Sequence, residues 1–130
     1  MANVLIVDDD AETAGALREV MNLEGHETRV AYNGRQGLAA LKVSIPDVVL
    51  LDVEMPVLAG PDMAIEMFLH DLGLESIPIV LISGVPNLAE SAAKIGTPYM
   101  LSKPFRYENL VAVINTALRE HRAPVPPEAR

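Results

Sequence analysis

Short runs of consecutive apolar residues recur along the chain and predict its strands. Three of these runs, at 4–7, 48–51 and 79–82, contain only aliphatic residues. A continuous apolar run of this length is typical of a strand that is buried on both faces of a parallel sheet. The segments 28–31 and 99–101 are less uniform, and we expect two further strands there.

Between these strands the apolar residues follow the helical spacing of three to four positions. The first such segment places Ala14, Leu17 and Met21 on one face. Further helices are expected at 34–44, after Pro61, at 87–95 and across 110–118. Strand and helix therefore alternate five times. This alternation predicts an α/β fold with a parallel sheet, helices on both of its faces and right-handed crossovers.

The composition of the chain predicts one globular domain. Of its 130 residues, 50% are hydrophobic and 22% are charged, which suits a single folded core. The chain has no cysteine, no secretory leader and no apolar stretch long enough to cross a bilayer, so we expect a cytoplasmic protein with no membrane partner. Its net charge of −8 argues against binding to nucleic acid.

The last eight residues differ from the rest of the chain in composition. Positions 123–130 contain three prolines and few side chains that a core could bury. We expect them to form a proline-rich C-terminal tail or the start of a linker. The predicted domain accordingly spans residues 1–122.

Polar residues that can carry chemistry stand at the ends of four predicted strands. Asp8 and Asp9 follow the first strand, Asp52 ends the third, and Ser83 and Lys103 follow the fourth and fifth. The carboxyl ends of parallel strands lie along one edge of the sheet, where ligands bind in open α/β folds. Each residue alone has an ordinary explanation as a helix cap, a turn residue or a surface lysine. Their joint placement favours a functional site.

Three carboxylates held together repel one another unless a cation lies between them. Oxygen ligands of this kind suit Mg²⁺, which takes one or two carboxylates together with water and phosphate oxygens. The lysine and the serine hydroxyl would supply two further donors. We therefore expect this set to hold a phosphoryl group on a carboxylate nucleophile, with the metal and Lys103 neutralising the phosphoryl oxygens during in-line transfer.

With these residues in place, the chain resembles the receiver domain of two-component response regulators. The resemblance covers about residues 2–120 and rests on an acid pair, an acceptor aspartate and a Lys-Pro pair in the same order. The matching residues are Val4 to Asp9, Asp47 to Asp52, Met55, Pro56, Gly60, Ser83 and Lys103 to Phe105. The resemblance implies a flavodoxin-like (βα)5 fold, in which a five-stranded parallel sheet has the order 2-1-3-4-5 and helices on both faces.

The resemblance also implies a metal and acceptor site. Asp52 would accept a phosphoryl group from a phosphohistidine and would also bind Mg²⁺. Asp9 would bind the ion directly, Asp8 largely through water, and Glu54 through its backbone carbonyl. These implied ligands are the oxygen donors that Mg²⁺ prefers.

Ser83 and Lys103 would act on the phosphoryl group itself. By the resemblance, the Ser83 hydroxyl would bond a phosphoryl oxygen and carry the conformational switch. Lys103 would pair with the same group, and its peptide bond to Pro104 would be cis.

Two positions depart from the usual pattern of the family. An aromatic residue generally lies three positions before the lysine, whereas this chain has Met100 there and Tyr99 one position earlier. Successive strand residues point to opposite faces, so Tyr99 does not replace the missing ring unless a bulge shifts the register. Glu54 is acidic where many relatives carry a neutral side chain.

The resemblance implies a phosphorylation-dependent signalling switch and not an enzyme with a separate substrate. The phosphoryl donor would be a sensor histidine kinase or a histidine phosphotransfer protein. The phosphorylated domain would signal to an unidentified downstream protein, or form a homodimer, through a changed surface. We expect no output domain in this chain, and the alternative is a receiver taken from a larger regulator or a hybrid kinase.

Two other functions compete with the signalling switch. Asp52 followed two positions later by Glu54 loosely resembles the nucleophile loop of HAD-like aspartate-dependent phosphohydrolases, which also use Mg²⁺. Those enzymes carry a second aspartate at the later position, so the match is incomplete. A flavin-binding module of the same fold is the third possibility, but the acidic first loop disfavours a phosphate-bearing cofactor.

Overall fold

The computed structural model describes residues 2–53, 76–84 and 88–125. This part of the chain contains five strands and four helices, and strand and helix alternate as predicted except across the undescribed stretch between β3 and β4. In chain order they are β1 (Asn3–Val7), α1 (Ala11–Leu23), β2 (Glu27–Ala31), α2 (Gly34–Val43), β3 (Val48–Asp52), β4 (Ile79–Ser83), α4 (Leu88–Ile95), β5 (Tyr99–Ser102) and α5 (Tyr107–Glu120). The helix expected after Pro61 lies outside the described residues.

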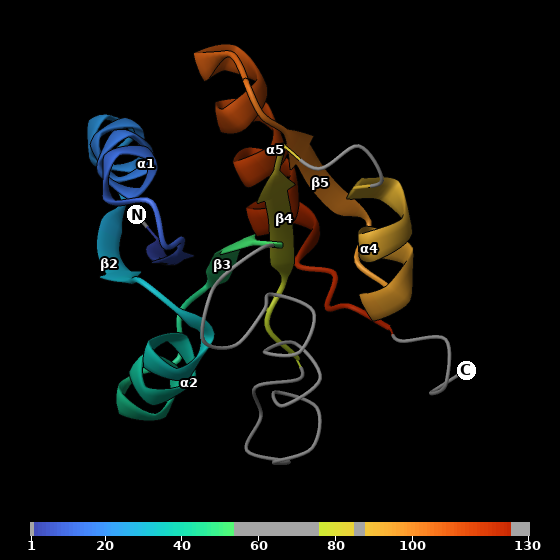
Figure 1. The fold of residues 1–130 in the computed structure, drawn as a ribbon, viewed down its shortest axis with the longest axis horizontal. Coiled ribbons are helices and arrows are strands. Elements are labelled where there is room, and N and C mark those ends of the chain that lie inside the picture. Colours follow the sequence, from blue (N-terminus) through green and yellow to red (C-terminus); the bar gives the residue numbers. More distant parts are fainter. Residues whose placement is uncertain (1, 54–75, 85–87, 126–130) are drawn as a thin grey trace.

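The strands form one parallel sheet in the order β2-β1-β3-β4-β5, and this confirms the predicted flavodoxin-like topology. Helices lie on both faces of the sheet (Figure 1). Strands β3 and β4 are buried along their whole length, in agreement with their uninterrupted aliphatic sequences.

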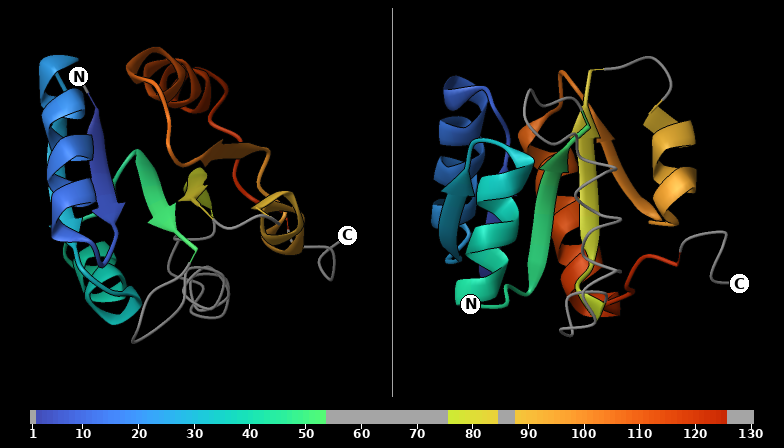
Figure 2. Two further views of the ribbon diagram at one scale, coloured as in Figure 1. Left: turned by 45° about the horizontal axis from the view of Figure 1, so that its top comes forward. Right: turned by 60° about the horizontal axis from the view of Figure 1, so that its bottom comes forward.

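Alternation along each strand divides the core into two layers. In β3, Val48 and Leu50 pack with the buried faces of α1 and α5. The intervening residues Val49 and Leu51 pack in a second cluster with α2 and α4. Figure 2 shows these helix pairs on opposite sides of the sheet. A strand side chain therefore reaches one helix layer or the other according to its position, because successive side chains point to opposite faces.

Side chains of the preceding loops fix where α1 and α2 begin. The Asp10 carboxylate accepts hydrogen bonds from the Glu12 N–H at 3.2 Å and from the Thr13 hydroxyl at 2.6 Å. Asn33 accepts a bond from the N–H of Gln36 at 2.9 Å at the start of α2. Both are N-caps, which satisfy backbone donors that have no partner within the helix. Across the described residues no helix combines the length and apolarity that a bilayer span requires.

Candidate functional site

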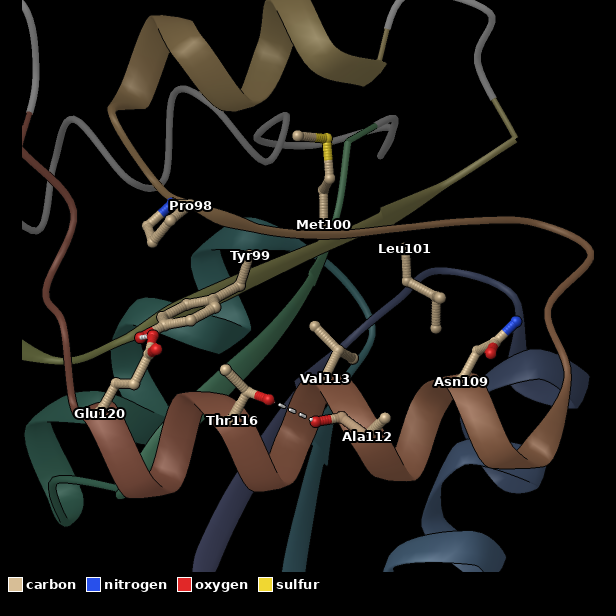
Figure 3. A pocket seen from close by; sticks show the side chains of 9 residues that line it. All are labelled: Pro98, Tyr99, Met100, Leu101, Asn109, Ala112, Val113, Thr116 and Glu120. Atoms are coloured by element: carbon tan, nitrogen blue, oxygen red, sulfur yellow. Dashed lines mark hydrogen bonds between the residues drawn. The ribbon is translucent and has the colours of Figure 1, made fainter.

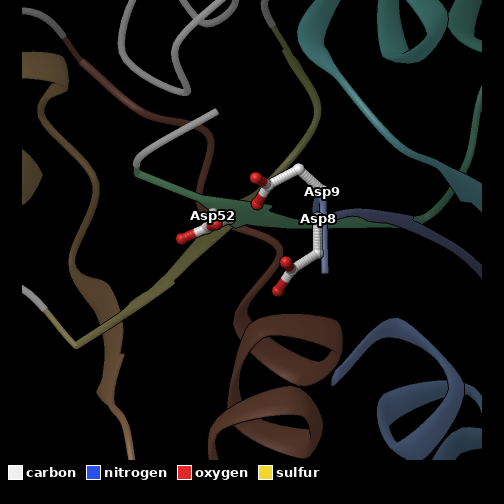
Figure 4. A group of neighbouring side chains, drawn as sticks. All are labelled: Asp8, Asp9 and Asp52. Carbon is white, nitrogen blue, oxygen red and sulfur yellow. The ribbon is translucent and has the colours of Figure 1, made fainter. Parts of the chain in front are cut away.

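The parallel register brings the acidic residues together at the carboxyl edge of the sheet. Val7 of β1 pairs with Leu51 of β3, so the residues that follow them, Asp8 and Asp52, lie side by side. One carboxylate oxygen from each of these two and from Asp9 lies within 4.8 Å of the others (Figure 4). Asp8 is 1% exposed and Asp52 is 7% exposed, whereas Asp9 is exposed to solvent. The predicted cluster therefore exists in the fold.

The other two predicted residues reach the same edge from β4 and β5. Ser83 is buried at the end of β4, and its carbonyl accepts a hydrogen bond from the Lys103 N–H at 2.9 Å. The Lys103 ammonium lies 3.0 Å from Asp8 Oδ2 and 4.0 Å from Asp52 Oδ1. The peptide bond between Lys103 and Pro104 is cis, as the resemblance implied. Lysine, serine and acids thus converge although β3 and β5 are far apart in the sequence.

The acid run at 8–10 divides into two functions. Asp10 caps α1, and the hydrogen bond from the Thr13 hydroxyl is the main reason why the pKa of Asp10 lies below its usual value. Asp8 accepts a bond from the Asp10 N–H at 3.0 Å, so the start of the helix helps to orient the buried carboxylate. The simple reading of this run as a helix cap is therefore right for Asp10 and incomplete for Asp8 and Asp9.

Charge and geometry together fit a divalent cation. Three carboxylates and one ammonium leave a formal charge of −2 at this edge, from −3 and +1. Three carboxylate oxygens within 4.8 Å of one another are oxygen donors of the kind that Mg²⁺ takes together with water, so Asp8, Asp9 and Asp52 would hold the ion here. The fourth ligand implied by the resemblance, the Glu54 carbonyl, lies outside the described residues.

A hollow of about 550 Å³ opens beside Lys103. It is lined by the first turns of α1 and by the loop that follows β5, with Thr13, Ala16 and Phe105 among its residues. The sequence did not indicate this hollow. The α1 residues that line it have no spacing that distinguishes them from other polar or small residues on the exposed side of a helix. It lies on the α1 side of the site, and Lys103 forms part of its wall.

The structure separates the two residues near the usual switch position. Tyr99 is 3% exposed and packs in the layer formed with α1 and α5. Met100 is 41% exposed, and Figure 3 shows it on the other side of β5, pointing away from α5. The expected alternation is confirmed, and no bulge brings the Tyr99 ring to the position of Met100.

Known proteins match this chain over nearly its whole length. The model of the family described as response regulator receiver domain matches residues 4–115. The DNA-binding response regulator MtrA of Mycobacterium tuberculosis is 33% identical over a region that covers 91% of this chain and 51% of MtrA. The transcriptional regulatory protein CpxR of Klebsiella pneumoniae is 34% identical, with 92% of this chain and 50% of CpxR covered. This chain thus spans about half the length of these curated relatives.

A solved structure supports the same assignment. The crystal structure of the receiver domain of NtrX from Brucella abortus matches with a TM-score of 0.80 and 32% sequence identity, over 89% of this chain and 98% of that one. The strand order, the acid cluster and the lysine at the carboxyl edge agree with the family match. The chain therefore belongs to the response regulator receiver domains, signalling proteins of two-component systems in which phosphorylation and Mg²⁺ are characteristic.

Proposed function

We propose that this domain is a signalling switch in which Asp52 accepts a phosphoryl group from the phosphohistidine of a sensor kinase or phosphotransfer protein. The observation that carries the proposal is the position of the Lys103 ammonium, 3.0 Å from Asp8 and 4.0 Å from Asp52, beside the cluster of three carboxylates. A buried nucleophile, a cation and a set of metal ligands are the parts that phosphoryl transfer to a carboxylate requires.

The proposed step is an in-line displacement at phosphorus. An oxygen of Asp52 forms the new bond to phosphorus, the bond from phosphorus to the imidazole nitrogen breaks, and the imidazole leaves with the electron pair. Lys103 turns from Asp8 toward the transferred group and neutralises one of its oxygens, while the Ser83 hydroxyl donates to another. Mg²⁺ held by Asp8, Asp9 and Asp52 would supply further positive charge for the phosphoryl oxygens.

Signalling would follow from the new partner of Lys103. Because Lys103 directly follows β5, a shift of its side chain acts on the strand that lies between α4 and α5. Met100 gives this strand an exposed apolar side chain on its α4 side. We propose that a downstream protein reads the changed surface of α4, β5 and α5.

The acceptor assignment predicts a labelling experiment. Incubation with acetyl phosphate and Mg²⁺ should add one phosphoryl group by mass, and Asp52→Asn should abolish the addition because the amide cannot act as the nucleophile. Asp10→Asn is the matched control: it removes a neighbouring acid but keeps an oxygen that can cap α1, so labelling should persist. Undiminished labelling of Asp52→Asn would refute the assignment.

The same preparation distinguishes the switch from a phosphohydrolase. A receiver should take one phosphoryl group for each molecule and should release inorganic phosphate slowly. Multiple turnovers of p-nitrophenyl phosphate that are lost in Asp52→Asn would instead favour the hydrolase.

A further inference from the structure

The chain does not leave the domain along the axis of α5. His121 adopts a left-handed conformation with φ of 51°, and its N–H donates to the Ala117 carbonyl at 2.8 Å. This turn ends the helix and redirects the backbone. Residues 122–125, here called the strap, then run past the end of α4 (Figure 1). Its last three residues, 123–125, belong to the stretch that the sequence indicated as a proline-rich tail or the start of a linker.

The far end of the strap is attached to the turn before β5. The Val125 N–H donates to the Gly96 carbonyl at 3.0 Å, and the Pro124 side chain is buried. Gly96 ends α4 with a positive φ of 78°, a conformation that suits glycine. Both the burial of Pro124 and the backbone hydrogen bond of Val125 attach this segment to the rest of the domain. The strap is therefore a packed part of the domain.

Tyr99 joins the near end of the strap to α5. Its hydroxyl donates to Glu120 Oε1 at 3.0 Å and accepts a bond from the Arg122 N–H at 3.4 Å. Figure 3 shows the ring extending from β5 toward Glu120 at the end of the helix. Burial and the bond to Glu120 raise the pKa of Tyr99, so its hydroxyl keeps its proton and remains a donor at neutral pH. One hydroxyl oxygen thus bonds to the last residue of α5 and to the first residue of the strap.

We propose that Tyr99 is a latch that holds residues 122–125 across the turn between α4 and β5 and so sets the direction in which the chain leaves the domain. A phenylalanine would fill the same buried space but would offer no oxygen to Glu120 or to Arg122. Val125 therefore lies beside the turn that ends α4 when the latch is closed, and the strap pivots at His121 when the latch is open. This reasoning does not depend on Asp52 being the phosphoryl acceptor.

Limited trypsin digestion of the whole chain tests the latch. Trypsin cleaves after Arg122, whose side chain is exposed, but the protease can bind the flanking backbone only after the strap leaves its hydrogen bonds to Tyr99 and Gly96. Loss of one hydrogen-bonding hydroxyl should raise the released fraction, and with it the cleavage rate after Arg122, about fivefold in Tyr99→Phe. Hydrogen exchange of the Arg122 and Val125 amides should accelerate by a similar factor.

A matched control separates the latch from general destabilisation. Tyr107, the first residue of α5, donates from its hydroxyl to Glu24 at 2.6 Å, so Tyr107→Phe loses a tyrosine–glutamate bond at an exposed position. It should leave cleavage after Arg122 unchanged. Cleavage after Arg29, inside β2, requires global unfolding and should remain much slower than cleavage after Arg122 in both variants. The proposal is overturned if Tyr99→Phe matches the wild type after Arg122, if Tyr107→Phe has the same effect, or if cleavage after Arg122 is no faster than cleavage after Arg29.

Discussion

Charged side chains have different partners at the two ends of the sheet. Near the amino end, charged side chains bind backbone groups: Arg29 donates to the carbonyls of Ala40 and Ser44 at 2.8 and 2.7 Å, and Asp47 accepts a bond from the Asn3 N–H at 2.7 Å. These contacts satisfy backbone carbonyls at the end of α2 and a backbone N–H at the start of β1. They need no bound species, because each charge meets a polar group of the fold itself.

At the carboxyl end, by contrast, charged groups face one another. Asp8, Asp9 and Asp52 crowd together, and the Lys103 ammonium offsets only part of their charge. Like charges at short range destabilise the fold unless something binds between them. The comparison indicates that charged side chains bonded to backbone groups stabilise the fold. Carboxylates that crowd together at the carboxyl edge of the sheet, with only one ammonium beside them, instead indicate a bound ligand.

The largest expected effect lies at the carboxyl end and concerns chemistry. Lys103→Met should slow labelling by acetyl phosphate about 100-fold, because an ammonium that neutralises the transferred oxygens is lost. Lys42→Met changes an exposed lysine in the last turn of α2 and should label at the wild-type rate. A rate for Lys103→Met within threefold of the wild type would contradict the role of Lys103.

The next effect lies at the amino end and concerns stability alone. Arg29→Met should lower the free energy of unfolding by about 2 kcal/mol, since two carbonyls at the end of α2 lose a charged donor. Urea denaturation measures this loss, and Arg18→Met, at an exposed position of α1, should lose much less. The labelling rate of the folded Arg29 variant should stay unchanged. A slower labelling rate would contradict the prediction that Arg29 contributes to stability alone.

The smallest effect concerns Mg²⁺. At ten times its dissociation constant the ion should stabilise the fold by about 1.4 kcal/mol, which raises the melting temperature by a few degrees for a domain of this size. Asp9→Asn should shrink this rise, because it removes a carboxylate from the cluster. Asp47→Asn, an acid at the other end of the sheet, should retain the full rise. Equal shifts in all three proteins would argue against the proposed metal site.

Most of the fold could be predicted because apolar periodicity depends on local sequence. The aliphatic runs place β1, β3 and β4 to within a residue, and the strand ends then place Asp8, Asp52, Ser83 and Lys103 at one edge. The apolar periodicity cannot show which of the polar side chains at that edge contact one another. It did not separate the capping acid Asp10 from its neighbours, and it could not show that Lys103 lies closer to Asp8 than to Asp52.

The contacts of the strap could not be predicted from the sequence. Proline-rich composition predicts a tail or linker from residue 123, and it does not indicate that Pro124 is buried or that Val125 bonds to Gly96. This attachment depends on one backbone carbonyl and one tyrosine hydroxyl contributed by other elements. Isolated contacts of this kind leave no repeating pattern in the sequence, so only the three-dimensional arrangement shows them.

The division of the core by strand alternation has a consequence for how the domain tolerates substitution. Leu41 of α2 and Ile114 of α5 lie in different layers, and the buried sheet separates them. Energetic effects of distant residues that share no partner are close to additive. Changes that accumulate in one layer therefore leave the other nearly undisturbed. One side of the domain can diverge to suit a new binding protein while the opposite side retains its ancestral packing.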